Sequence, residues 1–153
     1  MDYEDEGRGY KCRMNSAGAL IGLSQLKKIK EYLQKRRAIN DFYKDYFKEF
    51  SGVCFLKETL LDVTSNHWLS CFYFDHKVVD VDKYELMEFF KKNRIEVRFL
   101  WKPMHLQPVF KDFPYYGDKI AESLFLNGLC LPSGSNLIKN DLKRISESIK
   151  KFL

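Results

Sequence analysis

The sequence predicts a small α/β domain in which two long N-terminal helices precede a short mixed or antiparallel sheet with helices on one face. Two observations support this prediction. Apolar residues recur at helical spacing over the first third of the chain, and short apolar or alternating runs separate further helical patterns in the remainder. The expected order is two helices, then strand–helix–strand–helix–strand–helix. The 153 residues suit one domain, and no repeat or low-complexity tract interrupts them.

Two helices are expected to lead the chain, over residues 16–36 and 37–50. The first begins with small residues that let another backbone approach closely, which predicts a dimer or interdomain contact. The second carries a long apolar stripe at helical spacing that needs a neighbour, and Ser51-Gly52 is expected to end it. The small residues are Ala17, Gly18, Ala19 and Gly22, and the stripe is Ile39, Phe42, Tyr43, Tyr46, Phe47 and Phe50.

Strands and helices are expected to alternate in the middle of the chain. The nearly continuous apolar run 67–74 predicts a buried strand covered on both faces. Either Asp80 or Asp82 can cap a helix over 83–93. Residues 95–101 alternate in polarity, which predicts a strand with Arg98 on the face opposite Ile95, Val97 and Phe99.

The last three elements are expected to be a helix, a strand and a helix. The first of these helices covers 117–127 and ends at Asn127-Gly128, and a short strand follows over 129–131. Either Asn136 or Asn140 is expected to open the final helix. Its buried stripe would be Leu142, Ile145, Ile149 and Phe152.

The net charge of +5 raises the question of a nucleic-acid partner. The densest basic run lies within the first expected helix, where Leu26, Ile29 and Leu33 interleave with it at helical spacing. That pattern is typical of a solvated helix face opposite a buried stripe, and no DNA- or RNA-binding motif accompanies it. We therefore expect no nucleic-acid partner, with a phosphate-rich partner as the alternative. The basic residues are Lys27, Lys28, Lys30, Lys35, Arg36 and Arg37.

Other classes of protein are disfavoured by what the sequence lacks. No apolar run approaches the roughly 18–20 residues of a transmembrane helix, and the first residues are acidic rather than signal-like, so a cytoplasmic protein is expected. The cysteines and histidines are dispersed, which predicts neither a metal site nor a disulfide framework. Cys71 and Cys130 lie in apolar runs and are expected to be small buried hydrophobic residues.

Several segments together resemble one enzyme family. They are Gly9-Tyr10-Lys11-Cys12-Arg13-Met14, Gly22-Leu23-Ser24-Gln25-Leu26, Ser65-Asn66-His67-Trp68-Leu69-Ser70, Trp101-Lys102-Pro103-Met104-His105 and Gly128-Leu129-Cys130-Leu131-Pro132-Ser133-Gly134. In these segments the chain resembles the DegT/DnrJ/StrS sugar aminotransferases, which depend on pyridoxal phosphate (PLP), over nearly its whole length and in the same order. It looks closest to the branch that aminates nucleotide-linked 4-keto-6-deoxy sugars.

The resemblance implies that the chain is the small, C-terminal domain of a fold-type I aminotransferase. Residues 1–16 would be the interdomain bridge and cofactor-contacting loop, and residues 17–153 the small domain. In the family this loop reaches across the dimer interface to the PLP phosphate of the partner subunit. The implied cofactor contacts are Lys11, which replaces the usual Asn, Arg13, Asn15 and Ser16; either of the last two can cap the following helix. An interface salt bridge is the alternative role for Arg13.

A second group of residues is expected to contact the substrate. The strand ends in a proline-interrupted loop that carries a cation, an indole and an imidazole, and these groups suit a nucleotide-sugar diphosphate. In the family this segment lies beside the substrate. For Trp101 and Met104 the alternative is an ordinary place in the core, and Pro132-Ser133-Gly134 is expected to be a turn that fixes the last helix. The implied substrate contacts are Arg98, Trp101, Lys102, Met104, His105 and Gln107.

The resemblance also implies a missing half. In the family the Schiff-base lysine, the acid that pairs with the pyridine nitrogen, and the groups beneath the ring all belong to the large domain, upstream of the position of Gly9. The chain alone is therefore expected to be inactive, and to need a large domain or second subunit in an enzyme that is a homodimer when intact. Such an enzyme would serve polysaccharide or glycan biosynthesis. The alternative is a non-catalytic relic domain that binds a nucleotide sugar or a partner subunit.

Overall fold

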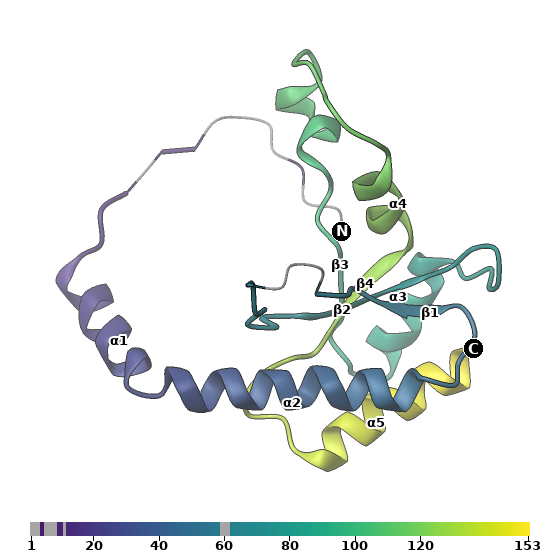
Figure 1. Ribbon diagram of the computed structural model, residues 1–153, viewed down its shortest axis with the longest axis horizontal. Coiled ribbons are helices and arrows are strands. Elements are labelled where there is room, and N and C mark those ends of the chain that lie inside the picture. The colour runs from purple at the N-terminus through teal and green to yellow at the C-terminus, as the bar shows by residue number, and fades with distance from the viewer. Residues whose placement is uncertain (1–3, 5–8, 11, 59–61) are drawn as a thin grey trace.

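The computed structural model describes residue 4 and residues 9–10, 12–58 and 62–153. The chain forms a four-stranded sheet. Figure 1 shows this sheet beside a group of helices, with the first helix standing apart from both. The helices are α1 (Ser16–Leu26), α2 (Ile29–Phe47), α3 (Lys83–Lys92), α4 (Ile120–Asn127) and α5 (Lys139–Phe152), with the short 3-10 turns η1 (Met104–Leu106) and η2 (Pro108–Phe110). The strands are β1 (Val53–Phe55), β2 (Ser70–Phe74), β3 (Arg98–Phe99) and β4 (Gly128–Leu131).

The sheet has the order β1-β2-β4-β3, and every neighbouring pair is antiparallel. The register places Phe72 opposite Leu129, and Cys130 opposite both Cys71 and Arg98. Side chains alternate between the faces of a sheet, so Cys71, Cys130 and Arg98 share one face while Phe72 and Leu129 point to the other. The expected α/β class with a short antiparallel sheet is confirmed.

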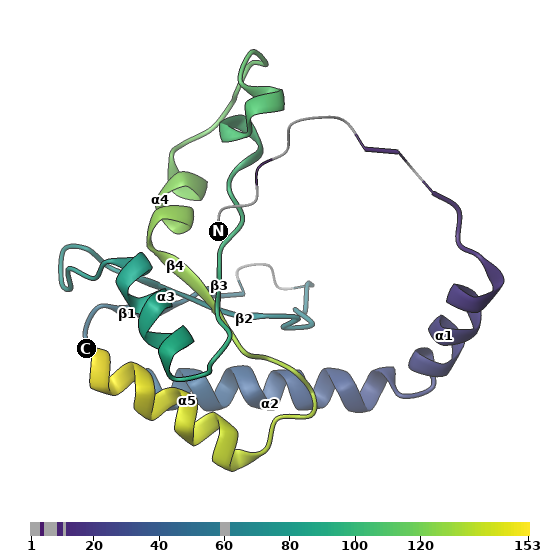
Figure 2. The same cartoon turned by 180° about the vertical axis from the view of Figure 1, so that it is seen from behind.

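The core lies on the Phe72 face of the sheet, where α2, α3 and α5 pack. Phe72, Leu129, Tyr43 and Leu86 are each at most 1% exposed. Figures 1 and 2 show α2 and α5 running along the same side of the sheet, as expected for helices gathered on one face. The expectation that β2 is covered on both faces is wrong. Its residues alternate between buried and half-buried, so the side that carries Cys71 and Tyr73 is only partly covered.

The break between the first two helices lies earlier than expected: α1 ends at Leu26 instead of Arg36, and α2 begins at Ile29 instead of Arg37. The chain turns at Lys27 and Lys28, and α2 then continues through Arg36 and Arg37 without interruption. Lys28 leaves the helical region with φ −109° and ψ 7°. The sequence has neither Gly nor Pro at this turn and no capping residue near Arg37. The boundary between the two helices was therefore predicted without a local signal and is wrong. The expected buried stripe is also incomplete, since Leu26 is 62% exposed.

Helix capping was predicted well at one helix and wrongly at another. The Asp82 carboxylate caps α3 by accepting from the backbone N–H groups of Tyr84 and Glu85, at 2.7 and 3.3 Å. Neither Asn136 nor Asn140 opens α5. Instead the Asp141 carboxylate accepts from the backbone N–H of Ile138 at 3.0 Å, so the acid reaches back from inside the first turn.

Two strand boundaries also differ from expectation. Strand β1 was not predicted, because its three residues are too few to show a period. Strand β3 covers only two of the seven residues expected, although Ile95 and Val97 are buried in the core as their alternation predicted. Arg98 faces away from them, as expected.

The turn before α5 is tied to both the sheet and α2. The Ser133 hydroxyl accepts from the Ser70 N–H and donates to the Leu131 carbonyl, both at 2.8 Å. The Tyr43 hydroxyl donates to the Pro132 carbonyl at 3.0 Å. Burial and the nearby Asp141 carboxylate raise the pKa of Tyr43, so this hydroxyl keeps its proton. None of the helices in the described part of the chain is long and apolar enough to cross a membrane.

Candidate functional site

A cavity of about 970 Å³ opens on the face of the sheet that carries Arg98 and Cys130. Its volume lies at the upper end of the range typical of small-molecule sites. Its walls come from Leu56 after β1, from Trp68 and Leu69 before β2, from residues 98–104 and from α4. Segments distant in the sequence therefore meet over this face of the sheet.

Two tryptophans form the most unusual feature of this cavity. The rings of Trp68 and Trp101 lie 5.6 Å apart with 32° between their planes. Both residues are more than half exposed, at 58% and 56%. A tryptophan normally buries most of its large apolar surface, so an exposed pair lining a cavity indicates a place for a flat or apolar ligand group.

The loop that carries Trp68 is held by α2. Arg36 donates to the Trp68 carbonyl at 2.7 Å, and Arg37 donates to the Ser65 carbonyl at 3.2 Å. His67, between them, has a φ of 42°, an uncommon conformation for a residue with a side chain. These contacts correct part of the sequence interpretation. The basic run is not purely a solvated face, because two of its arginines fix the cavity wall.

The loop that carries Trp101 is held by its own backbone and by Gln107. Pro103 leads into η1, and the buried Gln107 side chain donates to the Lys102 carbonyl at 3.3 Å. The Lys102 ammonium forms an ion pair with Glu4. Gln107 thus stabilises the loop. Lys102 is a cation at the cavity that is paired with Glu4.

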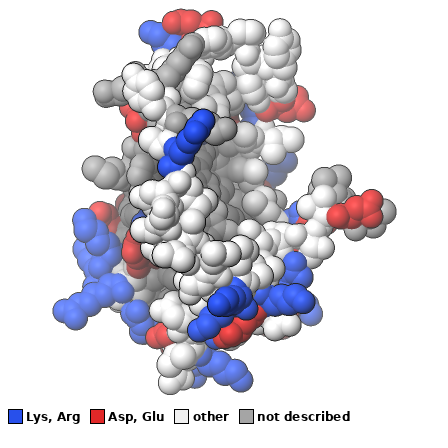
Figure 3. All heavy atoms as spheres, turned by 90° about the vertical axis from the view of Figure 1, so that its left-hand side faces the viewer, with Lys and Arg blue, Asp and Glu red and all other residues white. Residues whose placement is uncertain are grey.

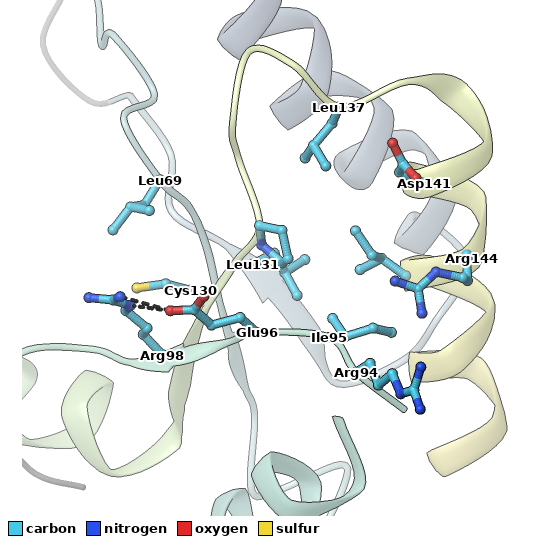
Figure 4. A pocket seen from close by; sticks show the side chains of 12 residues that line it. Leu69, Arg94, Ile95, Glu96, Arg98, Cys130, Leu131, Leu137, Asp141 and Arg144 are labelled. Carbon is cyan, nitrogen blue, oxygen red and sulfur yellow. Dashed lines mark hydrogen bonds and ion pairs between the residues drawn. The ribbon is translucent and has the colours of Figure 1, made fainter. Parts of the chain in front are cut away.

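Arg98 stands between this cavity and a smaller one of about 270 Å³. Figure 4 shows its guanidinium turned toward Glu96, with Cys130 beside it. Two hydrogen bonds join Arg98 to the Glu96 carboxylate, the shorter at 2.7 Å. Both side chains are more than half exposed, so this pair contributes on the order of 0–1 kcal/mol and an incoming anion can displace it.

His105 lies near the loop, but it does not line the cavity. Its Nε2 is 3.0 Å from a carboxylate oxygen of Glu122, on α4. The imidazole also stacks on the Tyr115 ring, with centroids 3.7 Å apart. This pairing fixes the ring and joins the loop to α4, which forms the opposite wall.

Three of the residues expected at the cofactor, Arg13, Asn15 and Ser16, lie at or just before the start of α1, and Figure 1 shows this helix apart from the sheet. Asn15, and not Ser16, is the cap, and its side chain accepts from the Gly18 N–H at 2.7 Å. Arg13 is exposed and forms no hydrogen bond or ion pair with another described residue. Lys11 lies outside the described residues.

Helix α1 exposes an apolar surface without a charged residue. None of its 11 residues is buried, and Leu20, Ile21 and Leu23 are each more than half exposed. Figure 3 views the molecule from the α1 side and shows Lys and Arg mainly in the lower half, with uncharged surface between them. An uncharged helix of this kind is typical of a surface that packs on another domain.

Five of the six residues expected at the substrate line the cavity, and the exception is His105. The sequence prediction did not include Trp68, which lines the cavity, or Glu122, which pairs with His105. Trp68 lay within a segment used for the family resemblance, and an exposed aromatic residue beside a polar Ser-Asn-His loop was the available signal. Nothing in the sequence pairs Glu122 with His105. Among the described residues, no group of three or more His, Cys, Asp or Glu side chains could hold a metal ion.

Comparisons with known proteins agree with the fold and the motifs. EpsN of Bacillus subtilis (strain 168) is 34% identical over 149 residues, which are 95% of this chain and 37% of EpsN. The GDP-perosamine synthase of Escherichia coli O157:H7 is 29% identical over 144 residues, or 94% of this chain and 38% of that enzyme. The solved structure of Helicobacter pylori PseC, an aminotransferase involved in pseudoaminic acid biosynthesis, matches with a TM-score of 0.78 and 28% identity.

That match covers 97% of this chain and 40% of PseC, so the chain spans about two fifths of the length of the relatives it matches. The sequence profile of the DegT/DnrJ/EryC1/StrS aminotransferases matches residues 1–150. The chain belongs to the DegT/DnrJ/EryC1/StrS aminotransferase family, whose members depend on PLP.

Proposed function

We propose that this chain is the small domain of a PLP-dependent aminotransferase that aminates a nucleotide-linked keto sugar for polysaccharide or glycan biosynthesis. The exposed Trp68–Trp101 pair at the 970 Å³ cavity carries the proposal. Residues 1–16 serve as the bridge to the large domain, and residues 17–153 form the small domain. The named relatives, among them a GDP-perosamine synthase, support a nucleotide sugar as the substrate class.

The cavity offers each part of such a ligand a suitable group. The indole faces accept a nucleobase by stacking, which contributes about 1–3 kcal/mol per base in single-stranded nucleic-acid sites. Arg98 and Lys102 supply positive charge for a diphosphate, and hydrogen bonds to charged groups contribute about 1.5–3 kcal/mol. Binding exchanges their contacts with Glu96 and Glu4 for contacts with the ligand. His105 acts from outside the cavity, through Glu122, by holding the loop against α4.

The start of α1 suits the phosphate end of PLP. Arg13 is a free cation among the described residues, and the first turn of α1 presents backbone N–H groups toward any anion placed there. Asn15 fixes this turn. PLP, when bound, supplies the electron sink for transamination. The Schiff-base lysine and the groups beneath the ring come from the large domain, and the phosphate contact forms across a domain or dimer interface.

The tryptophans provide a direct binding assay. They are the only two in the chain, so fluorescence excited in the indole band reports on the cavity alone. Titration with a nucleotide-linked 4-keto-6-deoxy sugar should give a saturable change. The Trp101→Ala variant should bind at least about tenfold more weakly, which corresponds to a loss of about 1.4 kcal/mol. Phe113→Ala is the matched control, because Phe113 is 54% exposed but lies outside the cavity.

Two results would contradict this binding mode. One is the absence of a saturable signal with any nucleotide sugar, and the other is equal affinity of the wild-type and Trp101→Ala chains. Isothermal titration calorimetry checks that the fluorescence change reports binding. Phosphate alone should compete weakly, because it engages the cations without the indoles.

A second assay distinguishes a domain of an enzyme from the alternative, a non-catalytic protein that binds a nucleotide sugar. That alternative is favoured by a cavity lined by residues of this chain. The chain is mixed with a polypeptide that supplies the large domain of EpsN, and PLP absorbance and transamination are measured. We expect both to require the mixture. Transamination by the purified chain alone would contradict the proposed division of labour, and inactivity of a mixture that forms a complex would favour the binder.

A further inference from the structure

Cys71 and Cys130 face each other across the centre of the sheet. They are directly paired in the register of β2 and β4, and their Sγ atoms lie 3.6 Å apart. Directly opposed residues of antiparallel strands have Cα atoms about 4.5–5.5 Å apart. A disulfide spans Cα separations of about 4.4–6.8 Å, so these two thiols can be joined with little movement of the strands.

The two thiols differ in access and in chemistry. Cys71 is half-buried, whereas Cys130 is only 3% exposed, so only the latter is the buried residue that the sequence predicted. A hydrogen bond from the Cys130 thiol lowers the pKa of Cys71, although burial opposes this effect. The same hydrogen bond raises the pKa of Cys130, and burial adds to it. The accessible sulfur is therefore the better nucleophile, and the buried one keeps its proton.

A cation stands next to this pair. Arg98 is the partner of Cys130 in β3, on the same face of the sheet, and Figure 4 shows its guanidinium near the Cys130 sulfur. The other two cysteines differ from this pair. Cys12 is exposed and Cys54 is half-buried in β1, and neither has another described thiol within hydrogen-bonding distance. Among the described residues, two thiols and a guanidinium come together only on this face.

We propose that Cys71 and Cys130 form a redox-active dithiol site, which a hydroperoxide converts into a cross-strand disulfide. This site is independent of the sugar-binding proposal. Cys71 reacts because it is the more accessible of the two thiols, and Cys130 resolves because its sulfur lies within contact distance. Disulfides of this transient kind are the ones expected in redox-sensing proteins.

The reaction proceeds in two balanced steps. The Cys71 thiolate attacks one peroxide oxygen, so an S–O bond forms, the O–O bond breaks, and the leaving hydroxide takes a proton to become water. The Cys130 sulfur then attacks the Cys71 sulfenic acid. An S–S bond forms, the S–O bond breaks, and the departing hydroxide takes the Cys130 proton to become the second water. Two thiols lose two electrons in total, and one hydrogen peroxide is reduced to two waters.

The test exposes the full chain to hydrogen peroxide in slight excess. In a Cys12→Ser/Cys54→Ser variant we expect the titratable thiols to fall from two to none, the intact mass to fall by two hydrogen atoms, and dithiothreitol to reverse both changes. The protein should remain monomeric on a non-reducing gel. Adding Cys130→Ser should stop the reaction at a sulfenic acid that dimedone traps on Cys71.

Peptide mapping of oxidised wild-type chain provides a second measurement that needs no substitution. It should recover a peptide that links Cys71 to Cys130, in preference to any pair that includes Cys54. Two thiols still titratable after treatment, a disulfide between two chains, or a linkage that involves Cys54 in preference would overturn the proposal. So would oxidation of Cys71 beyond the sulfenic acid while Cys130 stays free.

Discussion

Helices α1 and α3 are nearly equal in length and opposite in their surroundings. Helix α1 has 11 residues and α3 has 10, and both begin with an Asn or Asp side chain that caps the first turn. Helix α3 buries Leu86 and Phe90 in the core, whereas α1 buries nothing. Isolated helices of this length are marginal in water. Local signals place both helices, but among the described residues only α3 gains burial in the core, so the expected contact of α1 with another domain stays a prediction.

The largest expected effect on stability comes from replacing one leucine in each helix. Leu86→Ala should lower the free energy of unfolding by about 2–5 kcal/mol, because the side chain is fully buried and its loss leaves a cavity. Leu23→Ala, at a residue that is 58% exposed, should change it by less than about 0.5 kcal/mol. Urea denaturation followed by circular dichroism measures both.

The same two variants can contradict the difference between α1 and α3. A loss of 2 kcal/mol or more for Leu23→Ala would mean that α1 packs on the body of this chain in solution. In a complex with the large domain we expect the ranking to change, since Leu23→Ala should then weaken binding while the isolated chain stays stable.

The elements that the sequence predicted correctly are those with local signals. Asp82 caps α3, and Asn127-Gly128 ends α4, because each signal acts within one turn of its helix. The turn at Lys27–Lys28 carries no such signal. The start of α5 depends on Asp141 reaching back to Ile138, which a search for a cap before the helix does not find. Helix ends with a local capping signal were predicted correctly, and helix ends without one were not.

The candidate site shows the same limit. Five expected residues between 98 and 107 line the cavity, because a contiguous strand and loop deliver them together. Trp68 joins them only through the order β2-β4-β3, and Cys71 meets Cys130 only through the register of β2 and β4. Strand order and register depend on long-range pairing, so one sequence without relatives does not reveal these neighbours. The roles expected of Arg13 and Lys11 remain predictions.

A smaller effect is expected from replacing one tyrosine in the packed body and one beside α1. Tyr43 is fully buried in the body, whereas Tyr10, before α1, is 97% exposed. Tyr43→Phe should lower the free energy of unfolding by about 1–2 kcal/mol at neutral pH, because the Pro132 carbonyl loses its donor. Tyr10→Phe should leave it unchanged.

The pH dependence distinguishes this effect from a packing loss. The pKa of Tyr43 is raised in the folded chain, so its contribution is complete below the unfolded value of about 10. Above that pH the unfolded chain releases the proton and the folded chain keeps it. Stability should then fall by up to about 1.4 kcal/mol per pH unit from this group. The Phe variant should lack this part of the alkaline loss. Equal slopes in the wild type and the variant would show that Tyr43 is not the cause.

The smallest expected effect removes the two caps. Asp82→Ala should lower the free energy of unfolding by about 1 kcal/mol, because two N–H groups of a helix in the cooperative core lose their acceptor. Asn15→Ala removes an equivalent hydrogen bond, to Gly18, yet it should leave the urea midpoint unchanged. Its effect should appear locally, as faster amide hydrogen exchange within α1, since that helix opens without unfolding the body. Equal shifts of the urea midpoint for the two variants would mean that α1 and α3 unfold as one unit, and the difference between the two helices would then lie only in their exposure.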